Sequence, residues 1–159
     1  MRRWPFVLAA AVIAADRVSK RIIETQVRDW DLIPVIPGLF QIVHTRNTGV
    51  AFGMFAEQGA SGGRILLVLF SVAVMALVAS LLWSACRNRQ EHWTLAGALA
   101  LVWGGAAGNL YDRVAFGSVT DFLDFYWRTH HFPVFNLADS AITVGAGLLL
   151  LNLWVVRKR

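Results

Sequence analysis

Three aspartates in the last third of the chain are the residues most able to do chemistry. Asp139 lies near the start of the apolar stretch FNLADSAITVGAGLLLLNLWVV, and Asp121 and Asp124 precede it in SVTDFLDFYW. A carboxylate at the edge of a bilayer is expensive to desolvate, so it is by default a candidate functional site with a partner elsewhere. Two carboxylates held close together share a proton and can act as base and acid on one water, as in aspartic proteases. The spacing leaves open whether Asp121 or Asp124 meets Asp139.

Two further pairs of polar residues are expected at the level of these aspartates. Asp16 and Lys20 are four apart, so they lie on one helix face with the acid N-terminal, which is the favourable order for an ion pair. This pair can take part in catalysis or simply anchor its helix. Asn109 and Arg113 have the same spacing, and an amide with a guanidinium can hold an extended peptide backbone.

Other polar residues have structural as well as functional explanations. Asn47 falls in TRNTG (45–49), where a turn is expected, and Asn136 is placed to cap the helix that contains Asp139. An acid in the first turn of a helix is stabilised by the helix dipole by about 0.3–1 kcal/mol, so Asp139 could be purely structural. Asp112 is expected to point away from these groups and to act on the loop that follows it.

Metal and serine chemistry fit the sequence less well. No HExxH motif is formed by the four histidines, so we predict neither a metal site nor another cofactor; these are His44, His92, His130 and His131. A serine–lysine hydrolase is conceivable with Ser140 and Lys20. Ser140 adjoins Asp139, however, and is equally well explained as part of the first turn of a helix.

The composition indicates an integral membrane protein. Of the 159 residues 57% are hydrophobic and only 16% are charged, and the mean hydropathy is +0.53. A transmembrane helix needs about 20 apolar residues, and four stretches approach that length: 4–23, 65–86, 93–110 and 137–156. We therefore expect one domain, 1–159, with four transmembrane helices. The basic and then apolar start, MRRWPFVLAAAVIAAD, also resembles a cleaved secretory signal.

The distribution of charge predicts the orientation. Basic residues crowd into the two short termini and the connection 87–92, which places both termini in the cytoplasm. All acids except Glu91 lie on the other side, so the active site is expected near the extracytoplasmic face. The basic residues flank apolar spans instead of forming a patch with interleaved aromatics, which favours membrane lipids over nucleic acid as their partners.

The segments outside the spans should carry some structure of their own. LFQIVH (39–44) and GVAFGMF (49–55) are plausible strands on either side of the turn at TRNTG, and they predict a small extracytoplasmic sheet between the first two helices. Within the helices, Gly104 and Gly108 are four apart and predict the close approach of another helix. Gly145 and Gly147 are expected to serve likewise.

Five motifs together resemble the bacterial lipoprotein signal peptidase family, also called signal peptidase II. They are DRVSK (16–20), RNTGVAFG (46–53), GGAAGNLYDR (104–113), VTDFLDF (119–125) and FNLADSA (135–141). They occur in order through the whole chain. The resemblance implies an intramembrane aspartic endopeptidase that removes the signal peptide from prolipoproteins, before a cysteine that carries a diacylglyceryl group. It also implies four transmembrane helices and an extracytoplasmic β-sheet cradle.

Carried over by motif, the resemblance makes Asp121 and Asp139 the catalytic pair and sets Asp124 aside. A further set is expected to line or support the site: Asn47, Asn109, Arg113, Asn136, Asp16 and Lys20. We expect direct attack by water, with no covalent intermediate, by a monomer in the bacterial inner membrane. Which aspartate is the base cannot be read from the sequence, because the pair titrates as a unit.

Two rival functions make different predictions. A small transporter or proton channel would need carboxylates spaced through the depth of the bilayer, whereas Asp16, Asp121 and Asp139 are expected at one level. A purely structural membrane protein predicts that replacing Asp121 or Asp139 by Asn changes nothing.

Overall fold

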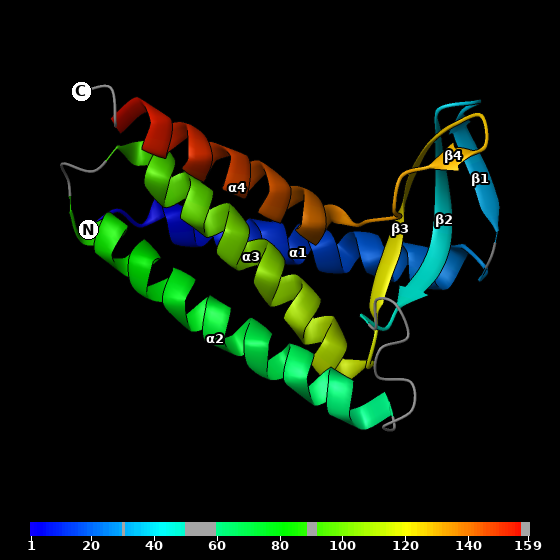
Figure 1. Cartoon of the computed structure of the whole chain (residues 1–159), viewed down its shortest axis with the longest axis horizontal. Helices are drawn as coiled ribbons and strands as arrows, with labels where there is room; N and C mark the ends of the chain where they lie inside the picture. The colour runs from blue at the N-terminus through cyan, green and yellow to red at the C-terminus, as the bar shows by residue number, and fades with distance from the viewer. Residues whose placement is uncertain (30, 50–59, 89–91, 157–159) are drawn as a thin grey trace.

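The chain forms four long helices with a small antiparallel sheet at one end of them (Figure 1). The computed structural model describes residues 1–29, 31–49, 60–88 and 92–156. The helices are α1 (Trp4–Gln26), α2 (Ala60–Arg87), α3 (Trp93–Ala115) and α4 (Leu137–Val156). The strands are β1 (Leu32–Ile36), β2 (Phe40–Asn47), β3 (Val119–Trp127) and β4 (His130–His131). The start of α1 and the end of α4 lie at the end of the bundle away from the sheet (Figure 1).

The four helices coincide with the four predicted apolar stretches, and three of them are longer than predicted. By length and composition, two helical segments among the described residues could cross a membrane, Gly63–Arg87 and Leu137–Trp154. Helix α1 carries five charged side chains, and both α1 and α3 contain charged groups that are buried: Asp16, Lys20 and Asp112. For α1 and α3, a transmembrane position therefore stays a prediction.

Helix α3 lies at the centre of the bundle and packs against α1, α2 and α4. Its buried face consists largely of alanine and glycine, including Ala96, Ala98 and Ala100. Small side chains let helix backbones approach closely, which favours association where the surrounding lipid offers no hydrophobic driving force. The central helix is thus the element against which the polar residues of three other segments can be brought together.

Glycines mark the closest approaches between helices. A Cβ on Gly104 would lie 2.9 Å from the carbonyl oxygen of Ala9 in α1, and one on Gly108 would lie 2.6 Å from Oδ2 of Asp16. Gly145 of α4 packs in the same way on α3, so the prediction is confirmed for these three glycines. It is wrong for Gly147, where a Cβ would meet nothing within 4 Å.

Replacing Gly105 by alanine is expected to destabilise the protein by about 1–3 kcal/mol, the usual cost of overpacking. The new Cβ would collide with the carbonyl oxygen of Ala138 and lie 2.9 Å from Cγ1 of Ile142, so α3 and α4 would have to separate. Gly147→Ala is the matched control, because that position is open. Thermal unfolding in detergent, followed by tryptophan fluorescence, should show a lower midpoint for Gly105→Ala alone. Equal midpoints would contradict the packing argument.

The sheet differs from the predicted one in both its strands and its turn. Its order is β1-β2-β3-β4 with antiparallel pairing, so half of its strands come from the segment between α3 and α4. LFQIVH is confirmed as a strand, but β2 continues through Asn47 because Thr45, Arg46 and Asn47 pair with β3. The turn predicted at TRNTG is therefore wrong as to residues 45–47. From residue 50 onward, the predicted strand GVAFGMF lies outside the described residues.

Candidate active site

A reciprocal cap at the start of α4 fixes the position of Asp139. The side-chain oxygen of Asn136 accepts a hydrogen bond from the backbone N–H of Asp139 (2.9 Å), and a carboxylate oxygen of Asp139 accepts one from the backbone N–H of Asn136 (3.3 Å). Such a capping box satisfies two backbone donors that a helix start would otherwise leave unpaired. The predicted capping role of Asn136 is confirmed, and the cap also aims the carboxylate of Asp139.

Asn136 also connects this cap to Asp121. Its fully buried amide nitrogen donates to Oδ1 of Asp121 (2.6 Å) and to the side-chain oxygen of Asn109 (3.2 Å). Because both ends of the amide are engaged, its orientation is fixed. One asparagine thus touches both of the aspartates that the sequence motifs single out.

Each of the two aspartates receives a second amide. Asn47, at the end of β2, donates to Oδ2 of Asp121 (3.0 Å), and Asn109 of α3 donates to Oδ1 of Asp139 (2.8 Å). Asp121 is 3% exposed, whereas Asp139 is half-buried. Four segments that are far apart in the sequence therefore contribute to one polar cluster at the sheet end of the bundle.

The buried ammonium of Lys20 connects a second group of polar residues to the cluster. Lys20 forms ion pairs with Asp16 (2.8 Å) and Asp112 (2.7 Å) and donates to the side-chain oxygen of Asn109 (3.0 Å). Because that oxygen faces Lys20, the amide nitrogen of Asn109 must face Asp139. Asp16 in turn accepts from the backbone N–H of Ala138, in the first turn of α4 (3.0 Å). The predicted Asp16–Lys20 ion pair is confirmed.

Asp112 is a member of this second group that the sequence analysis missed. We expected it to act on the following loop, but it is 1% exposed and pairs with Arg17 (2.6 Å) as well as with Lys20. The expectation was wrong because α3 continues to Ala115 and so turns Asp112 toward α1. Its position three residues after Asn109, on the same helix face, was the available signal.

Arg113 borders the cluster but does not bond to either aspartate. One guanidinium nitrogen donates to the backbone carbonyl of Asn109 (3.4 Å), and its buried Nε has no partner within the described parts of the chain. Arg64, at the start of α2, donates to the backbone carbonyls of Arg113 (3.1 Å) and Val114 (3.1 Å). Arg64 therefore caps the last turn of α3 and fixes the backbone of Arg113.

Asp124 is held in a different place. Its carboxylate accepts from the side chain of Gln41 (2.7 Å) and lies 2.9 Å from Nδ1 of His131 in β4. Successive side chains of a strand point to opposite faces, so residues three apart, such as Asp121 and Asp124, diverge. Of the two candidates that the spacing left open, Asp121 is the one that joins Asp139.

Burial is the main influence on the protonation of Asp121. It raises the pKa of this carboxyl above its ordinary value of 3.8, and the negative charge of Asp139 raises it further. Hydrogen bonds from Asn47 and Asn136 and the charge of Lys20 act in the opposite direction, but the pKa remains raised. Asp121 is therefore inclined to keep a proton at a pH where an exposed aspartate has lost it.

The raised pKa predicts how stability depends on pH. The folded protein holds the Asp121 proton more tightly than the unfolded chain does, so this contribution is complete below about pH 3.8 and is lost as pH rises through the folded pKa. Wild type should therefore lose stability relative to Asp121→Asn as pH rises from about 4 to 8. Thermal unfolding midpoints across that range test this, with the exposed Asp31→Asn as control. A difference in unfolding midpoint between wild type and Asp121→Asn that stays constant over this pH range would contradict the prediction.

The residues of the cluster fit acid–base catalysis better than metal-dependent or serine–lysine catalysis. Within the described residues, no three His, Cys, Asp or Glu side chains come together in a way that could hold a metal ion. Ser140 donates to the backbone carbonyl of Asn136 (3.0 Å), and Lys20 is held by two carboxylates, so neither forms a serine–lysine pair. Two carboxylates oriented by neutral amides remain, and these can move protons to and from a water and a peptide bond.

Comparison with known proteins points to a single family. The family model for signal peptidase (SPase) II matches residues 8–155. The lipoprotein signal peptidase of Solibacter usitatus is 46% identical over 153 residues, covering 95% of this chain and 91% of the relative. That of Symbiobacterium thermophilum is 44% identical over 154 residues, covering 96% and 95%.

A solved structure agrees with the sequence relatives. It is described as a bacterial membrane enzyme, has a TM-score of 0.79 at 30% identity, and covers 94% of this chain and 87% of that chain. A second structure with the same description has a TM-score of 0.78, also at 30% identity, and covers 94% and 91%. The chain therefore belongs to the signal peptidase II family, and it is a membrane protease.

Proposed function

We propose that this protein is an aspartic endopeptidase that removes the signal peptide from diacylglyceryl-modified prolipoproteins, cutting before the lipidated cysteine. The observation that carries the proposal is the side-chain amide of Asn136, which donates to the carboxylate of Asp121 and accepts from the backbone N–H of Asp139. The relatives named lipoprotein signal peptidase support the class of substrate. Asp121 and Asp139 are the proposed catalytic residues.

In the proposed mechanism, water attacks the scissile carbonyl carbon directly. Asp139 is the ionised partner and takes a proton from the water, while protonated Asp121 gives its proton to the carbonyl oxygen. The tetrahedral intermediate then collapses as Asp139 passes its proton to the leaving nitrogen and Asp121 recovers a proton from the hydroxyl. Two observations support this division of roles: burial raises the pKa of Asp121, and Asp139 is the more exposed of the two.

The surrounding residues position the pair and the substrate. Asn47 and Asn109 each donate to one aspartate and orient it. Lys20 fixes the orientation of the Asn109 amide by donating to its oxygen. The guanidinium of Arg113, whose buried Nε has no hydrogen-bond partner among the described residues, is the proposed donor to a carbonyl of the substrate backbone.

The proposed orientation places both termini in the cytoplasm and the cluster near the extracytoplasmic face of the inner membrane. In this position the acyl chains of the substrate stay in the bilayer while its peptide reaches the cluster. We propose that the enzyme acts as a monomer, because the residues of the cluster all come from one chain. An ion relay is less well supported, since the buried acids Asp16, Asp112 and Asp121 belong to one cluster that Lys20, Asn109 and Asn136 connect.

Cleavage of a purified prolipoprotein tests the proposed function. Detergent-purified protein should cut a diacylglyceryl-modified precursor before the modified cysteine, with and without a chelator, as identified by mass spectrometry of both products. The same precursor without the diacylglyceryl group is the control and should be cut much more slowly. Equal cleavage of both precursors, or cleavage elsewhere, would refute the proposed substrate. A wild-type protein that cleaves neither precursor, with or without the chelator, would favour the structural or transport alternatives.

A further inference from the structure

The end of the bundle that holds the two termini has the character of a membrane interface. Four exposed tryptophans surround it, one from each helix: Trp4, Trp83, Trp93 and Trp154. Tryptophan is enriched where a bilayer meets water, at the level of the lipid headgroups. The termini and the connection 87–92 together contain seven Lys and Arg residues but a single acid, Glu91. Anionic headgroups are therefore the natural neighbours of this end.

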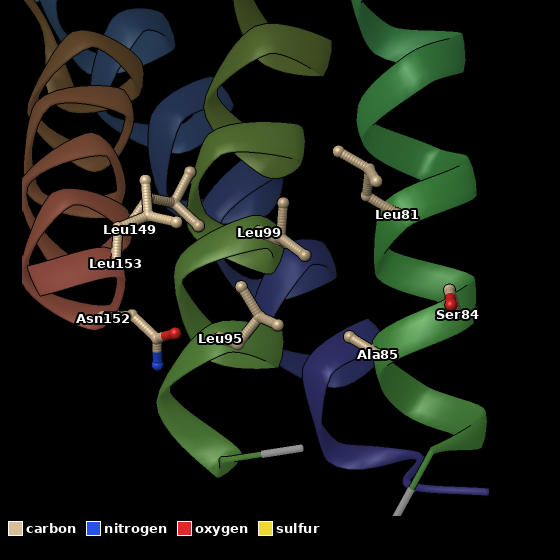
Figure 2. A pocket seen from close by; sticks show the side chains of 8 residues that line it. All are labelled: Leu81, Ser84, Ala85, Leu95, Leu99, Leu149, Asn152 and Leu153. Atoms are coloured by element: carbon tan, nitrogen blue, oxygen red, sulfur yellow. The ribbon is translucent and has the colours of Figure 1, made fainter. Parts of the chain in front are cut away.

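A groove opens between α2 and α4 at the same end. It has a volume of about 320 Å³ and is floored by α3, which separates the other two helices (Figure 2). Its walls are mostly leucine and alanine, with one polar side chain on each of α2 and α4. The lining residues are Leu81, Ser84, Ala85, Leu95, Leu99, Leu149, Asn152 and Leu153. Figure 2 shows Leu81 and Ala85 on one side, and Leu149 and Leu153 on the other.

Two polar side chains interrupt the apolar lining of the groove. Ser84 of α2 and Asn152 of α4 lie among its leucines, and Asn152 donates to the hydroxyl of Thr94 (3.0 Å). Arg87 follows Ser84 by three residues, in the last turn of α2, and its side chain is exposed. An occupant of the groove thus meets mainly leucine and two neutral polar groups, and Arg87 follows the groove residues of α2 at the end where the tryptophans lie.

We propose that this groove binds an anionic phospholipid, with an acyl chain between α2 and α4 and its phosphate beside Arg87. The charge of the mouth selects the occupant, because basic pockets between helices at the headgroup level bind anionic lipids. A zwitterionic lipid fits the apolar walls equally well but carries no net charge to match the basic end. The site lies at the opposite end of the bundle from the aspartates and does not depend on the proposed function.

Native mass spectrometry of the delipidated full-length protein tests the charge of the site. Wild type should retain phosphatidylglycerol more strongly than phosphatidylcholine with the same acyl chains. Arg87→Gln should weaken phosphatidylglycerol retention about fivefold, as expected for the loss of one basic residue near the headgroups, and leave phosphatidylcholine unchanged. Arg21→Gln is the matched control, because Arg21 is exposed near the other end of α1. If Arg87→Gln and Arg21→Gln weakened phosphatidylglycerol retention equally, the proposal would be overturned.

Filling the groove tests where the acyl chain lies. Ser84→Phe should lower retention of both lipids, whereas Ser80→Phe should not, since Ser80 is exposed on the same helix but does not line the cavity. Leu153→Trp, with Leu150→Trp as control, repeats the test from α4 in case Ser84→Phe fails to fold. Retention unaffected by both fillings would overturn the proposal. So would a raised KM for prolipoprotein with unchanged lipid retention, which would assign the groove to the signal peptide.

Discussion

Asp121→Asn and Asp139→Asn are each expected to lower prolipoprotein cleavage by about a thousandfold, within the range that positioned acids and bases contribute. Asparagine keeps the shape of each side chain but cannot accept or deliver the proton that the mechanism moves. Asp124→Asn should stay within a fewfold of wild type, because Asp124 is bonded to Gln41 and His131, apart from the cluster. The measurement is the single-turnover rate of cleavage of a diacylglyceryl-modified precursor.

The folding of each variant decides how this result is interpreted. All three proteins should elute as wild type does in gel filtration and unfold cooperatively. If only Asp124→Asn were inactive, the protein would still be an enzyme, but the wrong carboxylate would have been assigned. If Asp121→Asn and Asp139→Asn were both fully active, the aspartic mechanism would be excluded.

Lys20→Met is expected to reduce the free energy of unfolding by about 3–5 kcal/mol, the usual cost of breaking a buried ion pair from one side. The substitution leaves the carboxylates of Asp16 and Asp112 buried without their shared cation, and both are at most 1% exposed. It also frees the amide of Asn109 to rotate away from Asp139. Denaturant unfolding in mixed micelles measures the loss.

Two variants make the Lys20 prediction specific. Arg21→Met removes a cation from the exposed side of the same helix and should cost less than about 0.5 kcal/mol, as is usual for surface substitutions. Adding Asp16→Asn to Lys20→Met removes the carboxylate whose one ion pair among the described residues is with Lys20, and it should recover part of the lost stability. Strictly additive losses in the double variant would show that the ammonium does not couple to Asp16.

Local patterns predicted the helices and several of their polar contacts. Hydropathy alone located the four helices, because each apolar stretch approaches the length of a spanning helix and can be recognised without knowledge of its neighbours. The Asp16–Lys20 pair and the Asn136 cap were also predictable, since both depend on residues within one helical turn. Gly104 and Gly108 were read correctly for the same reason.

Contacts between distant segments could not be derived in this way. The pairing of β2 with β3 joins residues that are more than 70 positions apart, and no periodicity in either segment specifies the other. The choice of Asp121 over Asp124 follows from that pairing, so the residues alone left it open and only the resemblance selected Asp121. Asp112 was missed because its role depends on how α3 faces α1, which its own helix does not reveal.

The discontinuity of the cluster has a consequence for how the protein is made. Asp16 and Lys20 leave the ribosome early, but Asp139 and the capping box that aims it belong to the first turn of α4, the last helix to be made. A nascent chain that ends before the cap of α4 therefore contains Asp121 but neither Asp139 nor the amide of Asn136. During biosynthesis the proposed peptidase stays inert until its last helix is in place, so an unfinished molecule cannot cleave precursors emerging nearby.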